Sequence, residues 1–312
     1  MEEKLRKVEE KESFKQHYLK FCPDFDLFME FNNKQLKRAI RVNTLKAEVS
    51  LIKKRLQNWK LEKIPWCKEG FTVNVERRDL GNTIEHSLGL IYIQEPASMI
   101  PAIVLDPKKD EFILDMAASP GSKTTQIAAL MQNTGLIIAN DYKGERLKAL
   151  GLNTQRMGIT NTAITLQEGR FFKNFEFDRI LLDAPCSGTG AIRKSINTIK
   201  EWNIDKIRRL SGIQKQLIQV AFDNLKVGGT LVYSTCSLEP DENEAIISYL
   251  LERNQKAQLE KIDSDKLGIK RSNTISEFNG IKFDKRVENC LRIWPQDNDT
   301  EGFFVAKIIK SK

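Results

Sequence analysis

The chain has 312 residues, 40% hydrophobic and 29% charged, a composition typical of a soluble protein with one large domain or a medium and a small one. It has no apolar run of about 18 residues, and its charged N-terminus lacks an apolar core, so neither a membrane span nor a secretory signal is expected. The five cysteines are widely spaced and form no Cys-x-x-Cys pair, which indicates neither a metal site nor a disulfide framework and favours the cytoplasm.

Lysine and arginine exceed aspartate and glutamate by eight, and the excess falls within residues 31–60. That segment contains a single acid, Glu48, and nine basic residues: Lys34, Lys37, Arg38, Arg41, Lys46, Lys53, Lys54, Arg55 and Lys60. A local positive patch is typical of a protein that binds a polyanion such as RNA. The alternative is a lysine-rich face that meets only solvent.

Along the chain, residues 1–30 have the apolar rhythm of a helix, which Pro23 interrupts. Residues 38–43 and 71–75 are predicted strands, and residues 50–59 an amphipathic helix. These elements predict a small α+β RNA-binding module over residues 1–85 that bears the basic patch.

Strands and helices then alternate over residues 86–312, which predicts an α/β domain with a doubly wound, Rossmann-like sheet. We expect the polar stretch 254–276 to be an insertion or mobile loop. Strands are predicted over residues 111–118, 135–141, 163–167, 179–183, 230–234, 290–294 and 303–308. Helices are predicted over residues 124–131, 145–157, 204–225 and 242–253.

Small residues join the first strand of this domain to its first helix, where a ligand could approach the backbone. A phosphate-binding P-loop is rejected, because Ala117 and Ser122 stand where that motif needs glycines. Asp141 ends the next strand, 20 residues after Gly121, and is placed to accept hydrogen bonds from a ribose. A ribose-bearing cofactor without a pyrophosphate cradle points to S-adenosylmethionine. The alternative is an ordinary turn with a surface aspartate.

Two cysteines follow predicted strands. Cys186 comes three residues after Asp183, and Cys236 follows the strand 230–234. Carboxyl ends of parallel strands form the edge where ligands bind in open α/β sheets. The alternative is that both thiols are small buried hydrophobic groups, as most free cysteines are.

Taken together, these motifs resemble the NOL1/NOP2/Sun family of RNA cytosine-5 methyltransferases over nearly the whole chain. DAPCSG (183–188) followed by STCS (234–237) is the most specific part of the match. The other matching segments are RVNTLK (41–46), YIQEPAS (92–98), DMAASPGSKT (115–124) and RIWPQDNDTEGFFVA (292–306).

The resemblance implies an S-adenosylmethionine-dependent methyltransferase domain behind an RNA-binding module. It implies that Cys236 is the nucleophile, that Cys186 assists product release, and that Asp183 and Lys123 also serve catalysis. Cofactor contacts are expected from Ala117, Ala118, Ser119, Pro120, Gly121, Ser122, Lys123, Asp141, Arg146, Glu168 and Asp183. The chain departs from the family at Ser119 and Ser122, where Ala and Gly are usual, and at Glu168, where Asp is usual.

We expect an RNA substrate, with tRNA preferred by analogy to compact archaeal members, and a monomeric protein. An rRNA substrate is one alternative. A DNA cytosine-5 methyltransferase would instead use Cys186, in its Pro-Cys dipeptide, as the nucleophile. An inactive RNA-binding protein on this fold is a further alternative, which the intact cysteines disfavour. Six more basic residues are candidates to extend the basic patch of residues 31–60 into a longer track that binds RNA phosphates: Arg193, Lys194, Lys200, Arg208, Arg209 and Lys215.

Overall fold

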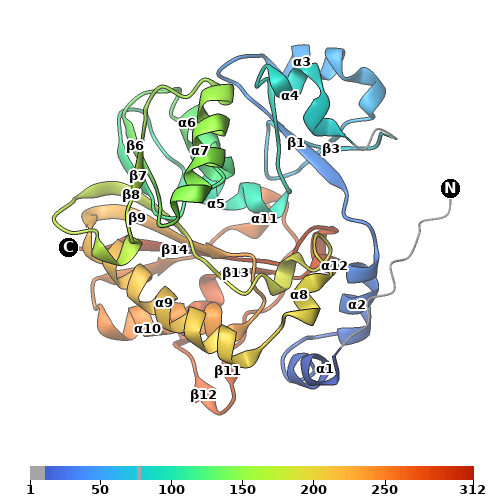
Figure 1. Ribbon diagram of the computed structural model, residues 1–312. Helices are drawn as coiled ribbons and strands as arrows, with labels where there is room; N and C mark the ends of the chain where they lie inside the picture. Colours follow the sequence, from blue (N-terminus) through green and yellow to red (C-terminus); the bar gives the residue numbers. More distant parts are fainter. Residues whose placement is uncertain (1–10, 76–78) are drawn as a thin grey trace.

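The computed structural model describes residues 11–75 and 79–312, which form a large and a small sheet with helices around them (Figure 1). Seven strands of the large sheet run in the order β10-β14-β9-β8-β5-β6-β7, and β13 pairs with β14. Its strands are β5 (Phe112–Asp115), β6 (Leu136–Asp141), β7 (Thr162–Leu166), β8 (Phe177–Asp183), β9 (Leu225–Thr235), β10 (Ala257–Glu260), β13 (Leu291–Ile293) and β14 (Phe303–Lys310).

The strands from β7 to β9 are parallel, and β14 runs antiparallel to β9. Successive side chains of a strand point to opposite faces of the sheet. Ile113 accordingly packs on the face covered by α5 (Ile100–Leu105) and α6 (Ser122–Leu130), and Leu114 packs on the face covered by α9 (Ile204–Asp223) and α10 (Glu244–Arg253). Helices on both faces confirm the predicted Rossmann-like α/β fold.

The small sheet has the order β2-β3-β1-β4 and lies at the upper right of Figure 1. Ile52 of the helix α3 (Val49–Arg55) packs on Ile40 and Val42 of β1. The strands are β1 (Arg38–Val42), β2 (Glu62–Lys63), β3 (Gly70–Val73) and β4 (Ile91–Ile93). Since β4 pairs with β1, the small sheet includes a strand from beyond residue 85; the division of the chain there stays a prediction.

Two short helices, α1 (Glu12–Tyr18) and α2 (Phe25–Asn33), stand where one interrupted helix is predicted. Asp24, next to Pro23, caps α2 by accepting a hydrogen bond from the Leu27 backbone N–H at 2.9 Å. Aromatic side chains of both helices pack around the buried Trp294, in a core shared with the large domain. The first ten residues of the predicted helix lie outside the described residues.

The prediction of an insertion or mobile loop over residues 254–276 is wrong. This stretch contains β10, which pairs with β14 at one edge of the large sheet, and the helix α11 (Ser264–Leu267). Ala257 and Leu259 point inward and their neighbours outward, a two-residue period too short to stand out among polar residues. The remaining helices and hairpin are α4 (Ile84–Ser87), α7 (Gly144–Met157), α8 (Asn197–Lys200), α12 (Pro295–Asn298), β11 (Glu277–Phe278) and β12 (Ile281–Lys282).

Within the described part of the chain, we find no helix with the length and apolar character needed to cross a membrane.

Candidate active site

The ends of β8 and β9 bring the two predicted site cysteines together. In the parallel ladder Asp183 lies opposite Ser234, and each strand leads directly into a cysteine-bearing loop. The sulfur of Cys186 lies 3.5 Å from the sulfur of Cys236, close enough for an S–H···S hydrogen bond. Both side chains are partly exposed rather than enclosed in the core. The two thiols therefore share one site at the carboxyl edge of the sheet.

Asp183 and Lys123, also predicted for this site, form an ion pair beside the cysteines. Lys123 Nζ donates to Asp183 Oδ2 at 2.7 Å, and the Ser234 hydroxyl donates to Asp183 Oδ1 at 2.7 Å. Burial lowers the pKa of Lys123, but the charge and hydrogen bond of Asp183, together with the charge of Cys236, raise it above its ordinary value. The amine is therefore charged, and a nearby cation favours a thiolate.

The two sulfurs have different environments. The pKa of the Cys186 thiol lies well above its ordinary value, because of its hydrogen bond with Cys236, then burial, then the charges of Cys236, Glu242 and Asp183. The Cys186 thiol therefore holds its proton more tightly than an ordinary cysteine does. Cys236 differs in lying near the amine of Lys123, whose pKa it helps to raise.

The predicted cofactor loop joins β5 to α6 and has a fixed backbone. Gly121 adopts a φ of 101°, a left-handed conformation that side chains disfavour. The Arg146 guanidinium donates to the carbonyl oxygen of Ser119 at 2.7 Å, and the Ser119 hydroxyl donates back to the carbonyl oxygen of Arg146 at 2.7 Å. The predicted residues 117–122 are thus held against the start of α7, with small side chains that leave the backbone approachable.

Asp141 ends β6 and is 1% exposed. Its Oδ1 accepts from the Lys143 backbone N–H at 3.1 Å, whereas its Oδ2, 3.3 Å from Arg146 Nη1, makes no hydrogen bond with any described residue. A buried oxygen with spare accepting capacity at a strand end fits a ligand hydroxyl. Glu168, after β7, differs because it is already bonded to Arg170 at 2.9 Å, which lowers the pKa of its carboxyl.

Two of the predicted RNA-contacting arginines have structural roles instead. Arg41 is 2% exposed and donates to Gln94, to the carbonyl oxygen of Ser122 and to Thr125. Arg193 is 3% exposed and pairs with Asp299 at 2.8 Å. Neither side chain faces solvent, so both are removed from the predicted track.

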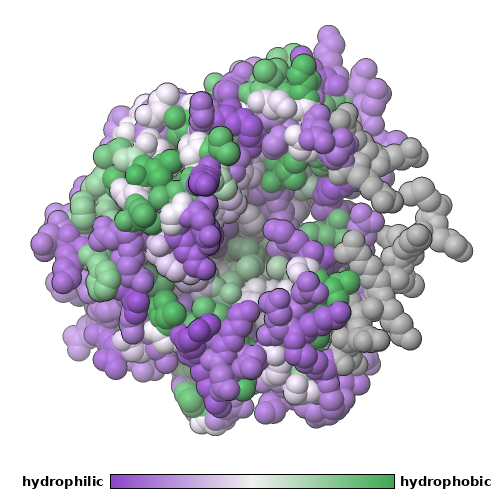
Figure 2. Space-filling model, in the orientation of Figure 1, coloured by the Kyte–Doolittle hydropathy of each residue, from purple (hydrophilic) through white to green (hydrophobic). Residues whose placement is uncertain are grey.

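Many of the other basic residues do face solvent, and Lys34, Arg38 and Lys215 are partly buried. The exposed ones are Lys37, Lys46, Lys53, Lys54, Arg55, Lys60, Lys194, Lys200, Arg208 and Arg209. Figure 2, in the orientation of Figure 1, shows the molecule hollowed between the lobe that carries α7 and the lobe that carries α3.

Sequence reasoning missed several buried polar residues around the cysteines. Asp115, at the end of β5, is 1% exposed and accepts a hydrogen bond from Thr124 at 2.6 Å. Glu242 is completely buried between the two cysteine loops. It belongs to the run DENE after a turn, which in sequence resembles the exposed acidic start of a helix. No pattern in the sequence distinguishes its burial.

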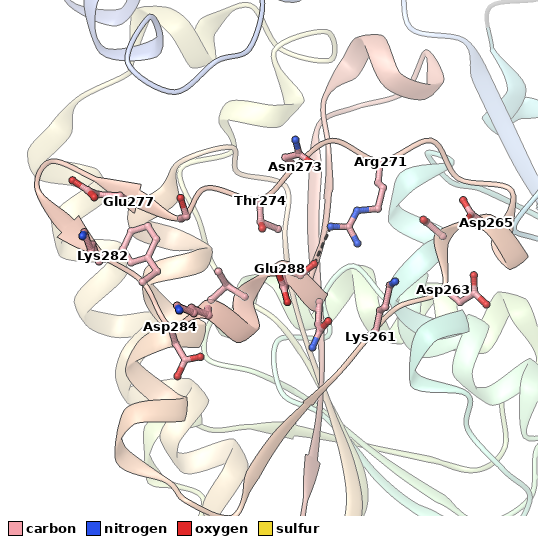
Figure 3. A pocket seen from close by; sticks show the side chains of 16 residues that line it. Lys261, Asp263, Asp265, Arg271, Asn273, Thr274, Glu277, Lys282, Asp284 and Glu288 are labelled. Atoms are coloured by element: carbon pink, nitrogen blue, oxygen red, sulfur yellow. Dashed lines mark hydrogen bonds between the residues drawn. The ribbon is translucent and has the colours of Figure 1, made fainter.

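A wide groove of about 1330 Å³ lies elsewhere, around the segment 261–289 (Figure 3). It contains none of the predicted site residues. Its charged lining is mixed: Lys261, Arg271, Lys282, Lys285, Asp263, Asp265, Glu277, Asp284 and Glu288. Arg271 donates to the backbone oxygen of Glu288 at 2.9 Å (Figure 3). Charges of both signs in an open groove indicate no particular ligand.

Within residues 11–75 and 79–312, no group of three His, Cys, Asp or Glu side chains is arranged to hold a metal ion.

Residues 102–309 match the family described as 16S rRNA methyltransferase RsmB/F, and residues 11–96 match the N-terminal domain of 16S rRNA methyltransferase RsmF. The chain belongs to this methyltransferase family. The membership confirms the resemblance to the NOL1/NOP2/Sun proteins.

Two curated relatives of this RsmB/F-family methyltransferase illustrate its range. The tRNA (cytosine(49)-C(5))-methyltransferase of Pyrococcus abyssi is 47% identical over 293 residues, which are 93% of each chain. The ribosomal RNA small subunit methyltransferase F of Shewanella oneidensis is 43% identical over 92% of this chain. The match spans only 60% of the Shewanella protein.

Solved structures agree with the fold of this RsmB/F-family methyltransferase. A methyltransferase homolog protein from Pyrococcus horikoshii superposes with a TM-score of 0.86 at 37% identity, covering 97% of this chain and 96% of its own. NSun6 from the same organism gives a TM-score of 0.80 at 24% identity, covering 96% and 97%. The second comparison supports the fold alone.

Proposed function

We propose that this protein transfers a methyl group from S-adenosylmethionine to carbon 5 of a cytosine in RNA, with tRNA as the substrate. The observation that carries the proposal is the pair of sulfurs, Cys186 and Cys236, 3.5 Å apart beside the ion pair of Lys123 and Asp183. A site with two thiols, a carboxylate and an ammonium group suits covalent catalysis on a pyrimidine ring.

The residues at the ends of β5 and β6 fit the cofactor. The Oδ2 of Asp141, which makes no hydrogen bond with a described residue, would accept from a ribose hydroxyl, and the small side chains of residues 117–122 would allow close approach. Arg146 fixes this loop by its bond to Ser119. Glu168 and Asp183 complete the proposed contacts. When bound, the cofactor supplies an electrophilic methyl group.

Carbon 5 of cytosine is too weak a nucleophile to accept a methyl group unaided. The thiolate of Cys236 adds to carbon 6, so that a C–S bond forms and an electron pair becomes available at carbon 5. That pair would form the new bond to the methyl carbon as the bond between this carbon and the cofactor sulfur breaks, which would leave the cofactor as a neutral thioether. Asp183 would hydrogen-bond the ring nitrogen or the exocyclic amine, with Lys123 stabilising its position and charge.

Product release requires the proton on carbon 5 to leave, so that the C5=C6 double bond re-forms and the sulfur of Cys236 departs as a thiolate. Cys186 is the proposed base or relay for this step. Its hydrogen bond to Cys236 is the largest cause of its raised pKa. Once Cys236 is bonded to carbon 6, that interaction and the thiolate charge are gone. Cys186 then loses its own proton to water more readily, and the resulting thiolate can accept the proton from carbon 5.

The choice of tRNA is supported by the Pyrococcus abyssi relative, whose name specifies a tRNA cytosine and which matches over 93% of both chains. An rRNA substrate remains the second candidate, since the Shewanella relative is named for ribosomal RNA. The test is incubation of the pure protein with labelled S-adenosylmethionine and either tRNA or 16S rRNA, followed by mass spectrometry of the nucleosides. The proposal predicts 5-methylcytidine in tRNA. Label found only in rRNA would contradict the choice of tRNA as the substrate. The absence of 5-methylcytidine from both RNAs would contradict the proposed reaction.

A further inference from the structure

Glu242 is a buried carboxylate between the two loops that carry the cysteines. It lies just before α10, its side chain is fully enclosed, and its backbone oxygen accepts from the Tyr233 hydroxyl at 2.6 Å. Burying a charge is unfavourable unless hydrogen bonds compensate for the lost water. The arrangement around its two oxygens shows what compensates.

One carboxylate binds the residue directly after each cysteine. Ser187, which follows Cys186, donates its backbone N–H to Oε1 at 2.9 Å and its hydroxyl to Oε2 at 2.5 Å. Ser237, which follows Cys236, donates its hydroxyl to Oε2 at 2.5 Å. The two serine hydroxyls also lie 3.1 Å from each other. The loops after β8 and β9 are therefore bridged through a single side chain.

We propose that Glu242 is a positioning residue that sets the separation of the two cysteine sulfurs by binding the chain immediately after each of them. The expected effect of Glu242 on methyl transfer rests on the proposed function. Its expected effect on the positions of the two sulfurs does not.

The chemistry of the bridge requires a carboxylate of this length. Gln214 adds a further donor, at 3.1 Å from Oε1, so that donors alone face both oxygens. An ionised carboxylate only accepts, whereas an amide would direct its own N–H groups at one pair of these donors. Aspartate keeps the charge but is one methylene shorter and cannot reach both loops from the same backbone.

Glu242 also acts on Cys186 through its charge. Burial raises the pKa of Glu242 to about 7, while hydrogen bonds from Ser187 and Ser237 oppose this. Its negative charge is one of the causes that raise the pKa of Cys186, together with Cys236 and Asp183. Removing this charge should therefore lower the pKa of the Cys186 thiol. Cys186 would then compete with Cys236 as the ionised sulfur.

The test compares Glu242→Gln with Ile247→Val, a core substitution on α10 that removes one methylene and no hydrogen bond, and so controls for lost stability. Methyl transfer to tRNA gives kcat and KM, and calorimetry gives the affinity for S-adenosylmethionine. Alkylation by iodoacetamide as a function of pH, read on the two cysteine peptides by mass spectrometry, gives each thiol's reactivity without requiring activity. Thermal unfolding is measured for both variants.

For Glu242→Gln we expect kcat to fall on the order of 10- to 100-fold, as for a misplaced catalytic group, with cofactor affinity within about 2-fold. Alkylation of Cys186 should begin at a lower pH than in the wild type. If kcat and both alkylation profiles change no more than in Ile247→Val, the inference is wrong. If the wild type methylates no RNA cytosine while the alkylation shift is seen, the proposed function fails and the effect of Glu242 on the Cys186 thiol stands.

Discussion

The guanidinium of Arg41, in β1 of the small sheet, donates to the carbonyl oxygen of Ser122 at 2.8 Å in the first turn of α6. The same side chain donates to Gln94 at 2.5 Å and to Thr125 at 2.9 Å. A residue of the basic segment therefore connects the small sheet to the helix that carries Lys123. Hydrogen bonds, rather than a free linker, therefore join the module expected to bind RNA to the site expected to bind the cofactor.

Replacing Arg41 with Met should mainly reduce stability. Burial lowers the pKa of Arg41 to about 10, and its removal takes one donor each from the Gln94 side-chain oxygen and from the Ser122 carbonyl, which keeps the Thr125 hydroxyl as a donor. We expect the free energy of unfolding to fall by roughly 2 to 4 kcal/mol, measured by urea denaturation. Lys54→Met removes the same charge from the exposed face of α3 and should change stability by less than about 0.5 kcal/mol. Equal losses in the two variants would contradict the structural role of Arg41.

The exposed lysines of the small module should instead affect RNA binding. The double variant Lys54→Ala, Lys60→Ala removes two exposed charges, and each lost phosphate contact lowers the salt dependence of affinity. We expect weaker tRNA binding at low salt and a slope of log K against log salt smaller by about 1 to 2, measured by fluorescence anisotropy. An unchanged slope would show that this face does not meet the RNA backbone.

Asp141 and Glu168 should contribute unequally to cofactor affinity. The Oδ2 of Asp141 is buried and makes no hydrogen bond with a described residue, whereas Glu168 already binds Arg170. Asp141→Ala should weaken S-adenosylmethionine binding by about 1.5 to 3 kcal/mol, and Glu168→Gln by less than about 1 kcal/mol. Isothermal titration calorimetry measures both. A larger loss of cofactor affinity in Glu168→Gln than in Asp141→Ala would contradict the assignment of Asp141 as the stronger contact.

Asp115 should make stability depend on pH. Burial raises the pKa of its carboxyl to about 7, against a hydrogen bond from Thr124 and with a further increase from the charge of Asp183. The folded state holds this proton more tightly than the unfolded state does. The protonated Asp115 therefore adds to the free energy of unfolding below about pH 4, and this contribution is lost as the pH rises through about 7.

The matched variant is Asp115→Asn, which resembles the protonated acid. Its melting temperature should lie close to that of the wild type at pH 5 and above it at pH 8, where the wild type has lost the contribution of the protonated acid and each kcal/mol corresponds to about 2 to 4 °C. Differential scanning calorimetry without cofactor measures the difference. A difference that stays constant between these pH values would exclude Asp115 as the titrating group.

The sequence was sufficient to predict the residues that meet at the strand ends. Cys186 and Cys236 follow apolar strands, and parallel strands deliver their carboxyl ends to one edge, so contact between the loops follows from topology. What could not be predicted is where charged side chains point. Arg41 looks like its lysine neighbours in sequence, and only the folded chain shows the buried carbonyl that it meets. The burial of Glu242 depends in the same way on a loop 55 residues away.

The most direct test of the central claim is the covalent bond between Cys236 and RNA. Wild-type protein, Cys236→Ala and Cys186→Ala are each incubated with tRNA and S-adenosylmethionine, and the products are separated by denaturing electrophoresis. We predict that Cys186→Ala accumulates a protein–RNA adduct that survives denaturation, because elimination is blocked. Cys236→Ala should form no adduct and lose at least about 100-fold in methyl transfer. An adduct formed by Cys236→Ala and absent from Cys186→Ala would assign the nucleophile to Cys186 and contradict the account.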